Sequence, residues 1–412
     1  MDEVEKLVPN VIDRSRNLDT PAGHVLPYSF LMMRSTKNVH TRRKAAIEYL
    51  GINKGSKYIP TIIQIVNDYI QSFKSGQIVN FSKISKLITF EIISEQILGK
   101  DYRDIKIDFE YLCPQSGTIS KMSFPQFFLN LLESEFAGFI NPKSKLLKFL
   151  TDSHLIEPYK TNYRNNLYLR KRLVDLVEAS TDMDSMYNKQ KQSGEFSTEE
   201  IIMDILTIIF GAYDTTSRSI CSNLYFFKKY PRVQKKLMEE ISKHKLDSLE
   251  EIPFHKLNDT LQDCDYLMYV IKETLRFDTP GPSTLPYEAY EQVDILGVTI
   301  PKGCRFVMGT VYTHFNPKYW HSPSEYLPER FDPESELYHK PGTKEMRHHK
   351  SLNSFSSGKR KCIGQSLAYL STKVVLTLLF TKLDYEVSEE LMNREKPSFD
   401  MFSNTDLIIK IN

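Results

Sequence analysis

A ten-residue segment near the C-terminal end of the sequence constrains the fold most strongly. Residues 355–364 join a long stretch punctuated by proline and glycine, 316–361, to an apolar pattern of helical spacing over 363–381. An irregular segment of this length inside a compact protein is usually functional. We therefore expect a loop at 355–364 that places Cys362 just before the N-terminus of the last long helix.

Cys362 is the best candidate for a thiolate in this sequence. The positive end of a helix dipole favours an anion, and the basic run 359–361 adds positive charge. Both effects are expected to lower the pKa of the thiol. Gly358 and Gly364 allow a tight turn and close approach of the backbone or of a flat ligand. Taken alone, Cys362 is equally consistent with a structural cysteine beside a basic surface.

The spacing of the cysteines disfavours a zinc ribbon and a redox dithiol. The chain has five cysteines, and they form no Cys-x-x-Cys or Cys-x-x-His pair. A reducing compartment is the simplest interpretation of this pattern.

Helical spacing dominates the remaining sequence. Apolar residues recur at intervals of three and four along most of 39–101. Ser197 and Glu200 form a capping box, and Pro231 suits the first turn of a following helix. The other helical segments are 144–180, 198–229, 231–245, 260–277 and 363–381, a short hairpin is expected at 294–303, and 1–36 is expected to be irregular. The predicted fold class is mostly α with a minor β part.

Charge and hydropathy exclude several classes of protein. Lys plus Arg number 54 and Asp plus Glu 52, so the net charge of +2 argues against a nucleic-acid surface spread over the whole protein. The sequence starts without a signal-peptide pattern, and no run approaches the ~18 apolar residues of a membrane-spanning helix. Met346–Leu383 holds seven Lys or Arg and no Asp or Glu, which leaves binding to RNA or to a lipid surface as a lower-ranked alternative.

Two further patterns place charged groups on helices. Asp214 and Thr215 interrupt an apolar helical segment, where such residues often only satisfy local hydrogen bonds. Glu273 and Arg276 share one helix face, and alone they suggest a surface ion pair that contributes ~0.2–0.5 kcal/mol. Residues 328–331 read Pro-Glu-Arg-Phe.

Together these motifs resemble the cytochrome P450 family, the haem-thiolate monooxygenases. The loop is similar to the family's haem-binding loop, with Ser354 where the family usually has proline. Gly211–Thr216 looks like the oxygen-activation segment, Glu273 with Arg276 looks like the Glu-x-x-Arg motif, and residues 328–331 match the Pro-Glu-Arg-Phe tetrapeptide. The matching loop positions are Phe355, Gly358, Arg360, Cys362 and Gly364.

The resemblance implies a haem-thiolate monooxygenase domain over 37–412 with the family's all-α fold. Residues 1–36 would be an irregular remnant of the front region, with part of the N-terminal sheet and helices missing. Haem b is the implied cofactor and Cys362 the implied iron ligand. Ala212, Arg43 and the loop residues named above are expected to bind the cofactor.

The implied reaction inserts one oxygen atom from O2 into a small apolar organic substrate. Electrons would come from an NADPH-dependent reductase, with cytochrome b5 as a further donor, and Asp214 and Thr215 would relay protons. Glu273, Arg276 and Arg330 are expected to form a buried network, in which breaking a pair typically costs ~3–5 kcal/mol. The protein is expected to be a monomer that does not bind nucleic acid.

Some positions depart from the family's pattern. Val39 replaces a tryptophan that binds a haem propionate, with His40 as a candidate substitute. Tyr287 stands where relatives often place Arg or His. Propionate binding is therefore expected to rest on Arg360 and Arg43.

The short front region leads to an alternative function. With 36 residues before the matching region, apolar surface near 294–303 is expected to be exposed and haem content to be sub-stoichiometric. The alternative is a truncated haem-binding or haem-less pseudoenzyme without turnover. Eukaryotic relatives are usually bound to the endoplasmic-reticulum membrane, although this sequence shows no anchor.

A surface for the reductase is also predicted beside the cysteine loop. The family's reductases tend to present acidic faces, so a basic surface would attract them. The residues expected to form it are Arg347, Lys350, Lys359 and Lys361.

Overall fold

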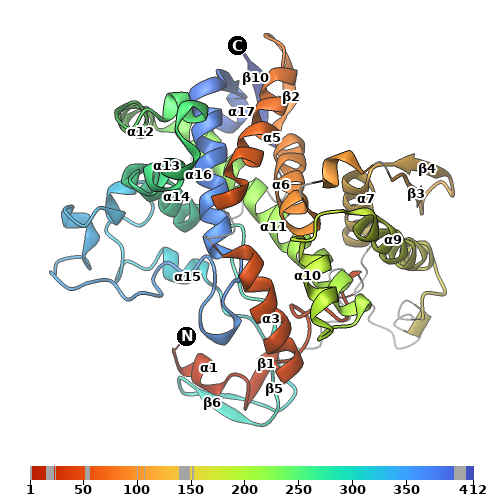
Figure 1. The fold of residues 1–412 in the computed structure, drawn as a ribbon. Helices are drawn as coiled ribbons and strands as arrows, with labels where there is room; N and C mark the ends of the chain where they lie inside the picture. The colour runs from red at the N-terminus through yellow and green to blue at the C-terminus, as the bar shows by residue number, and fades with distance from the viewer. Residues whose placement is uncertain are drawn as a thin grey trace.

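Helix α11 (Thr198–Lys229) runs through the middle of the molecule, and other helices pack on both sides of it (Figure 1). Its start is fixed by the predicted capping box. The Ser197 hydroxyl accepts a hydrogen bond from the Glu200 N–H, and the Glu200 carboxylate accepts one from the Ser197 N–H. The next helix, α12 (Pro231–Lys243), begins with Pro231 in its first turn, as predicted.

The computed structural model describes residues 2–14, 23, 25–51, 56–99, 101–105, 107–138, 149–150, 153–393 and 405–412. In this part of the chain helices predominate and strands are short, which confirms the mostly α fold class. Beside α11 and α12, its α-helices are α1 (Asp2–Leu7), α3 (Lys37–Leu50), α5 (Ile59–Ser72), α6 (Phe81–Leu98), α7 (Phe124–Gly138), α9 (Tyr159–Ala179), α10 (Met186–Ser193), α13 (Phe254–Gln262), α14 (Asp265–Phe277), α15 (Val311–His314), α16 (Gln365–Lys382) and α17 (Glu389–Met392).

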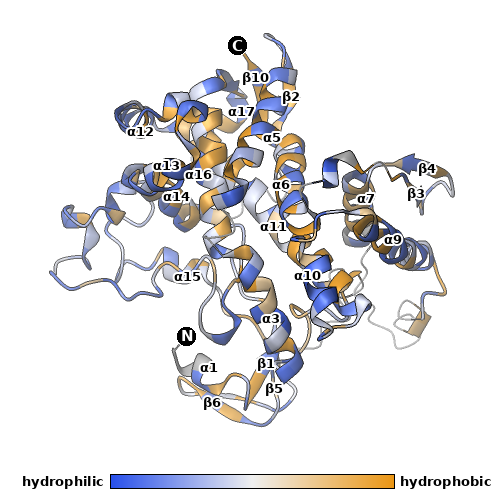
Figure 2. Cartoon of the chain, viewed as in Figure 1, coloured by the Kyte–Doolittle hydropathy of each residue, from blue (hydrophilic) through white to orange (hydrophobic). Residues whose placement is uncertain are grey.

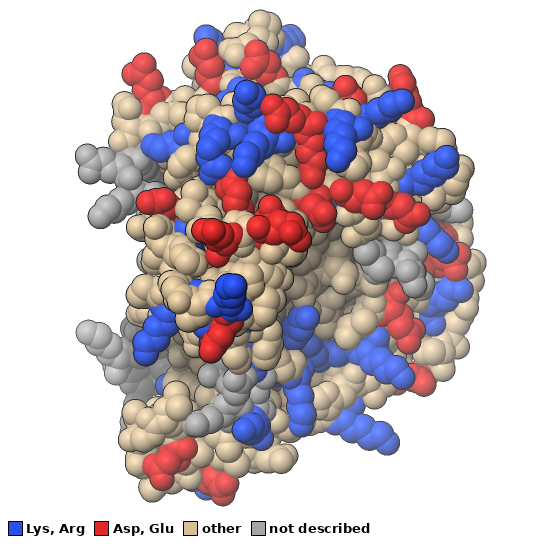
Figure 3. Space-filling model, turned by 90° about the vertical axis from the view of Figure 1, so that its left-hand side faces the viewer, with Lys and Arg blue, Asp and Glu red and all other residues tan. Residues whose placement is uncertain are grey.

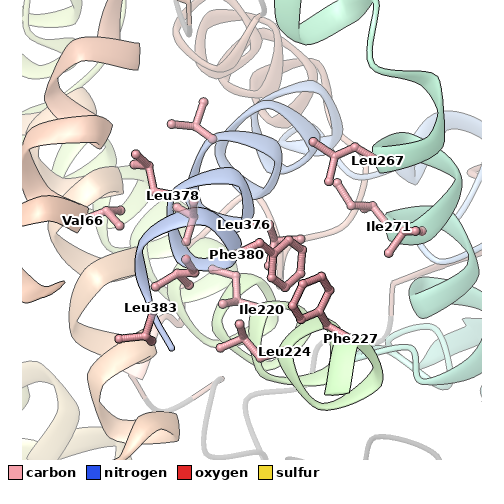
Figure 4. Packing of buried hydrophobic residues seen from close by; sticks show 14 of the residues in the cluster. Val66, Ile220, Leu224, Phe227, Leu267, Ile271, Leu376, Leu378, Phe380 and Leu383 are labelled. Atoms are coloured by element: carbon pink, nitrogen blue, oxygen red, sulfur yellow. The ribbon is translucent and has the colours of Figure 1, made fainter. Parts of the chain in front are cut away.

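One apolar core joins α5, α11, α14 and α16. Figure 4 shows Phe227 of α11 beside Phe380 of α16, and their ring centroids are 3.9 Å apart with an interplanar angle of 15°. Fully burying a side chain of this size stabilises the fold by ~1.5–3 kcal/mol. In Figure 2 apolar residues are frequent along α11 and α16, whereas the outer α12 is mostly hydrophilic. This core fixes α16 against α11.

A second core lies on the other side of α11 and is rich in aromatic rings. Phe90 of α6 lies 5.3 Å from Phe124 of α7 and 6.0 Å from Tyr213 of α11, measured between ring centroids. Phe128 of α7 lies 6.2 Å from the same tyrosine. Because Tyr213 is held in this way, the turn of α11 around it is fixed in position.

The small sheets lie at the edges of the helical body. Near the N-terminus, β1 (Ile12–Arg14) pairs with β5 (Tyr287–Ala289), and β5 pairs with β8 (Arg305–Phe306), all antiparallel. Arg14 lies opposite Tyr287 in this register. The remaining strands are β2 (Ile78–Asn80), β10 (Ile408–Ile411) and β9 (Tyr385–Val387) in one sheet, and the pairs β3 (Phe109–Leu112) with β4 (Ile119–Met122) and β6 (Val293–Ile295) with β7 (Val298–Ile300).

The predicted hairpin at 294–303 is confirmed as β6 and β7. Leu296 and Gly297 form its two-residue turn with φ of 52° and 80°, and such turns match the twist of a hairpin. Leu296 is 74% exposed and Val298 59% exposed. Val293, Ile295 and Ile300 instead pack against a small core formed by Val4, Val8, Ile12, Tyr287 and Ala289. The N-terminal segment therefore covers most of the hairpin, and the expected exposure is limited to its turn.

Two predictions of secondary structure were wrong. The segment 1–36 is not irregular throughout, because α1 and β1 form and β1 joins the sheet of β5. The segment 260–277 is not one helix, because the chain breaks between α13 and α14. Part of the predicted helix 144–180 lies outside the described residues, and α9 accounts for its later part. None of the helices described here is both long and apolar enough to cross a membrane.

Candidate functional site

A cavity of about 320 Å3 lies between α11, α16 and the loop 353–364. Its walls include apolar side chains from α6, α11 and α16, such as Ile92, Ile208 and Leu367. Polar groups gather at particular points of the wall: the cysteine loop, the middle of α11 and a group of arginines. Mostly apolar cavities with a few convergent polar groups are the usual form of cofactor and ligand sites.

The cysteine loop brings Cys362 to the cavity wall. The Cys362 N–H donates a hydrogen bond of 2.9 Å to the Phe355 carbonyl oxygen, which closes the loop. The ring of Phe355 packs against Tyr369 of α16, with 5.1 Å between centroids. Gly358 has a φ of 67°, which favours glycine, and it faces the outer side of the loop rather than the cavity.

Gly364 has a different role from Gly358. Its backbone angle is ordinary, and a Cβ built there would come only within 3.9 Å of Cys362 Sγ, a normal contact. Gly364 lines the cavity directly before α16 begins. Because Gly364 has no side chain, it leaves space in the cavity beside the sulfur, and it does not serve to form a strained turn.

The prediction of a lowered thiol pKa was wrong in direction. Burial among protein atoms raises the pKa of Cys362, although the Gly364 N–H, Arg43 and Lys361 act in the opposite direction. The exposed surface of the side chain faces the cavity, so the sulfur is both accessible and surrounded by protein. Desolvation therefore outweighs the helix end and the nearby cations.

The middle of α11 supplies the opposite part of the wall. Gly211, Ala212, Thr215 and Thr216 all line the cavity. The Thr215 hydroxyl donates a hydrogen bond of 2.8 Å to the Gly211 carbonyl oxygen, which leaves its own oxygen able to accept. Small residues beside a hydroxyl leave room for a flat ligand with a small molecule above it.

Asp214 lies away from this wall. Among the described residues that line the cavity Asp214 is missing, and its carboxylate pairs with Arg218 one turn on and lies 3.8 Å from Lys86 Nζ. The structure thus brings Thr215 to the cavity and Asp214 to a neighbouring ion pair. A relay role for Asp214 stays a prediction.

Arg360 and Arg43 meet at one side of the cavity, as expected. The buried Arg360 donates hydrogen bonds to the carbonyl oxygens of Phe30 (3.3 Å) and Met33, and its Nε lies 3.6 Å from Asp13 Oδ1. Arg43 Nη2 donates a hydrogen bond of 2.8 Å to the Lys361 carbonyl oxygen.

Arg14 is a third arginine of this group, and the sequence analysis missed it. It is buried, lines the cavity, and donates a hydrogen bond of 2.7 Å from Nη1 to the Leu285 carbonyl oxygen. Its guanidinium lies 4.6 Å from the centroid of the Tyr287 ring. The strand β1 thus supplies a cation beside the position where relatives carry one. The only signal in the sequence is the short apolar run before Asp13.

The other departures from the family's pattern have simple outcomes. Val39 is fully buried in the second core, and His40 is exposed and does not line the cavity. His40 therefore does not replace the missing tryptophan. The additional positive charge at this side of the cavity comes from Arg14.

The three arginines repel one another, which makes this side of the cavity suitable for an anion. Burial and then the charge of Arg14 lower the pKa of Arg43, and the same causes lower that of Arg360 to about 10. Asp13 acts in the opposite direction on Arg360 and Arg14. Apolar walls, a thiol on one side and three guanidinium groups at one end fit a flat apolar ring with two carboxylates. The residues present therefore fit haem.

The predicted network of Glu273, Arg276 and Arg330 is present and fully buried. Arg276 makes two hydrogen bonds of 2.8 Å to the Glu273 carboxylate, and Arg330 Nε lies 3.2 Å from Glu273 Oε1. The same oxygen accepts the Leu327 N–H at 2.8 Å. Most remaining N–H groups of the two arginines donate to backbone carbonyl oxygens, and one of these acceptors is the carbonyl oxygen of His314. The alternative of a surface ion pair is therefore wrong.

The predicted basic surface is only partly present. Lys359 and Lys361 are exposed, but Arg347 donates hydrogen bonds to two backbone carbonyl oxygens and stacks 4.4 Å from the Trp320 ring. Lys373 is also buried. Figure 3 shows both signs of charge on one face, with a band of Asp and Glu above a hollow bordered by Lys and Arg. The basic segment Met346–Leu383 is therefore no continuous surface for RNA or lipid.

Comparisons with known proteins show the family of this chain. The family model for cytochrome P450 matches residues 14–411. Cytochrome P450 3A13 of Mus musculus is 28% identical over 326 residues, which are 78% of this chain and 55% of the relative. Lithocholate 6-beta-hydroxylase of Mesocricetus auratus is 26% identical over 336 residues, 81% of this chain and 64% of the relative. The chain thus spans less than two thirds of the length of these relatives.

Solved structures show the same fold. The structure of retinoic acid-bound cyanobacterial CYP120A1 matches with a TM-score of 0.74 at 18% identity, covering 99% of this chain and 86% of that one. The heme domain of cytochrome P450DA matches with a TM-score of 0.73 at 16% identity, covering 99% and 85%. Since the family model matches nearly the whole sequence, this chain belongs to the cytochrome P450 family.

Proposed function

We propose that the chain is a haem-dependent monooxygenase that inserts one oxygen atom from O2 into a small apolar organic substrate. The observation that carries the proposal is the shared cavity, whose wall combines Cys362, Ala212 with Thr215, and three arginines. Bound haem b would supply the activation of dioxygen. Each part of this wall has a chemical property that would help to bind haem or to hold its reactants.

The residues divide the work by position. Cys362 would hold the iron through its sulfur, and deprotonation of its raised-pKa thiol would accompany metal binding. Arg14, Arg43 and Arg360 would hold the carboxylates of the ring. Phe355, Gly358 and Gly364 shape the loop around the sulfur.

The turn of α11 would control the oxygen side. Ala212 is a small residue of the cavity wall and would leave room there for bound dioxygen. The Thr215 hydroxyl can hold a proton at Oγ1 while it is bonded to the Gly211 carbonyl oxygen. Asp214, one residue earlier, is proposed to exchange protons with solvent at its carboxylate, which the ion pair with Arg218 would orient. The apolar walls exclude water and would hold an apolar substrate.

We further propose that an NADPH-dependent reductase supplies the electrons, with cytochrome b5 as an additional donor. Exposed Lys359 and Lys361 beside the cysteine loop support an acidic partner. The resemblance to mammalian relatives favours the endoplasmic-reticulum membrane as the location and a monomer as the working form.

The absorbance spectrum of the reduced protein with carbon monoxide tests the proposal. The long-wavelength band of thiolate-ligated haem should form, and Cys362→Ala should abolish it. Cys304→Ala, a partly exposed cysteine away from the cavity, is the matched control and should keep the band. A band that survives Cys362→Ala would refute the ligand assignment.

Turnover separates a monooxygenase from a haem-binding pseudoenzyme. Thr215→Ala should keep haem but lower product formed per NADPH consumed, with peroxide as the alternative product, and Thr215→Ser should restore most of the coupling. Haem binding with no turnover on any apolar substrate would favour the pseudoenzyme.

A further inference from the structure

The residues that enter the cysteine loop are tied to the helical body by two hydrogen bonds. The Asn353 N–H donates to His314 Nε2 at 2.9 Å. The Ser354 hydroxyl donates to the Leu275 carbonyl oxygen at 3.0 Å. Both ties immediately precede Phe355, whose carbonyl oxygen accepts the Cys362 N–H. The position of the sulfur therefore depends on where residues 353 and 354 are held.

Both ties end at residues that are bonded to, or adjacent to, a member of the buried arginine network. The His314 carbonyl oxygen accepts a hydrogen bond of 3.0 Å from Arg276 Nη1, so Arg276 fixes the backbone of His314. Leu275 directly precedes Arg276 in α14. The two anchoring points of the loop are thus bonded to, or adjacent to, one fully buried guanidinium.

His314 is suited to accept a hydrogen bond and to do nothing else. The side chain is fully buried, and burial together with the charge of Arg276 lowers its pKa to about 3. The imidazole therefore stays neutral, with the proton on Nδ1 and a lone pair on Nε2 aimed at the Asn353 N–H. A charged imidazole could not accept this bond.

Ser354 provides a bond that the family's usual residue cannot. Proline would restrict the backbone at this position but has no hydroxyl. Serine leaves the backbone freer, and its side chain fastens the same point to α14 instead. A side-chain hydrogen bond thus takes over from a ring constraint.

We propose that His314 and Ser354 are positioning residues that together set the cysteine loop at the geometry needed for thiolate ligation. This inference rests on the proposed haem-thiolate function. His314 acts through Asn353 and Ser354 acts through the backbone of Phe355, and neither residue touches the iron ligand.

Two matched pairs of variants test the proposal. His314→Gln keeps an acceptor near the position of Nε2, whereas His314→Asn places its amide near Nδ1, out of reach of the Asn353 N–H. Ser354→Thr keeps the hydroxyl, and Ser354→Ala removes it. The measured quantities are the fraction of carbon monoxide-bound haem that shows the thiolate band and the rate of haem transfer to an acceptor protein.

The Asn and Ala variants should lose the thiolate band roughly tenfold faster on standing and release haem roughly tenfold faster, the factor expected for one broken hydrogen bond at a buried site. The Gln and Thr variants should stay within about twofold of the parent chain. If the two residues only stabilise the fold, the variants should differ in their midpoint of thermal unfolding. The two members of each pair should then keep the same fraction of haem in the thiolate band.

The outcomes distinguish this inference from the function on which it rests. A parent chain without the thiolate band would refute the proposed function. A parent chain with the band, together with Asn and Ala variants that keep it as long as the Gln and Thr variants, would overturn the positioning roles. If His314→Asn does not fold, the Ser354 pair decides by the same criterion, because Ser354 is only partly buried.

Discussion

Two groups of arginines in this protein differ in what balances their charge. Arg276 and Arg330 share the Glu273 carboxylate, and backbone carbonyl oxygens accept their remaining hydrogen bonds. Arg14, Arg43 and Arg360 line a cavity together, with Asp13 as the nearby carboxylate. The first group is complete in itself and holds the fold, whereas the second has cationic capacity left for a ligand.

The largest expected effect comes from breaking the first group, Arg276 and Arg330 with Glu273, which is called the balanced group below. Glu273→Gln would leave two buried guanidinium groups without their carboxylate and should lower the free energy of unfolding by about 3–5 kcal/mol. Chemical denaturation of the haem-free chain measures this change. Asp175→Asn is the control, because Asp175 forms an exposed ion pair with Arg172 at the surface and should contribute less than about 1 kcal/mol. Equal losses in the two variants would mean that the buried Glu273 contributes no more than a surface carboxylate.

Acid should weaken the balanced group through His314. The folded pKa of about 3 lies below the ordinary 6.5, so the unfolded chain takes up the proton first. The contribution of neutral His314 to the free energy of unfolding is fully present above about pH 6.5 and is lost as the pH falls towards 3. About 2 kcal/mol of it should be lost at pH 5.

Comparing the parent chain with His314→Gln isolates this contribution. Asp204, whose pKa is raised to about 6 by burial, acts in the opposite direction but is common to both proteins. The difference in unfolding free energy between them should shrink from pH 7 to pH 5. A difference that is constant over this range would mean that His314 is protonated with an ordinary pKa.

A change in the second group, Arg14, Arg43 and Arg360, should alter the affinity for the ligand rather than the free energy of unfolding. Arg14→Gln removes one of three mutually repelling cations, so the haem-free chain should keep or gain stability. Haem affinity should fall roughly tenfold, as expected for a lost charge-assisted hydrogen bond. Arg34→Gln is the control, since Arg34 is exposed and does not line the cavity. A loss of haem-free stability with unchanged affinity would move Arg14 into the structural class.

The smallest effect concerns cations outside both groups. Reversing the charge of Lys359 and Lys361 should slow reduction by the reductase by a few-fold at low salt and flatten its salt dependence, because screening shortens to ~10 Å at 0.1 M. The same change at Lys344, exposed and farther along the irregular segment, should matter less. Indifference of the rate to both salt and Lys359–Lys361 would remove them from the partner surface.

Local signals predicted the helices well where the sequence itself carries the boundary. Ser197, Glu200 and Pro231 fixed the limits of α11 and the start of α12. The break between α13 and α14 has no glycine or proline. It depends on Glu240 of α12, whose carboxylate accepts the N–H groups of Tyr266 and Leu267 and so caps α14 from another helix. Such a cap is visible only in three dimensions.

The same distinction holds for the site. Cys362 and Thr215 lie in compact motifs, and the structure brings both to the cavity. Arg14 belongs to a three-residue strand whose partner β5 lies more than 250 residues on, so the short apolar run before Asp13 is its only local signal. The direction of the Cys362 pKa shift was also beyond the sequence, because desolvation depends on packing.

The position of Arg14 in β1 links cofactor loading to the assembly of the protein's first sheet. A ligand held by Arg14, Arg43 and Arg360 together favours the state in which β1 is paired with β5, since binding to one state stabilises that state. The pairing itself is short, with three residues in register. Binding of such a ligand and pairing of β1 with β5 would therefore share a single equilibrium.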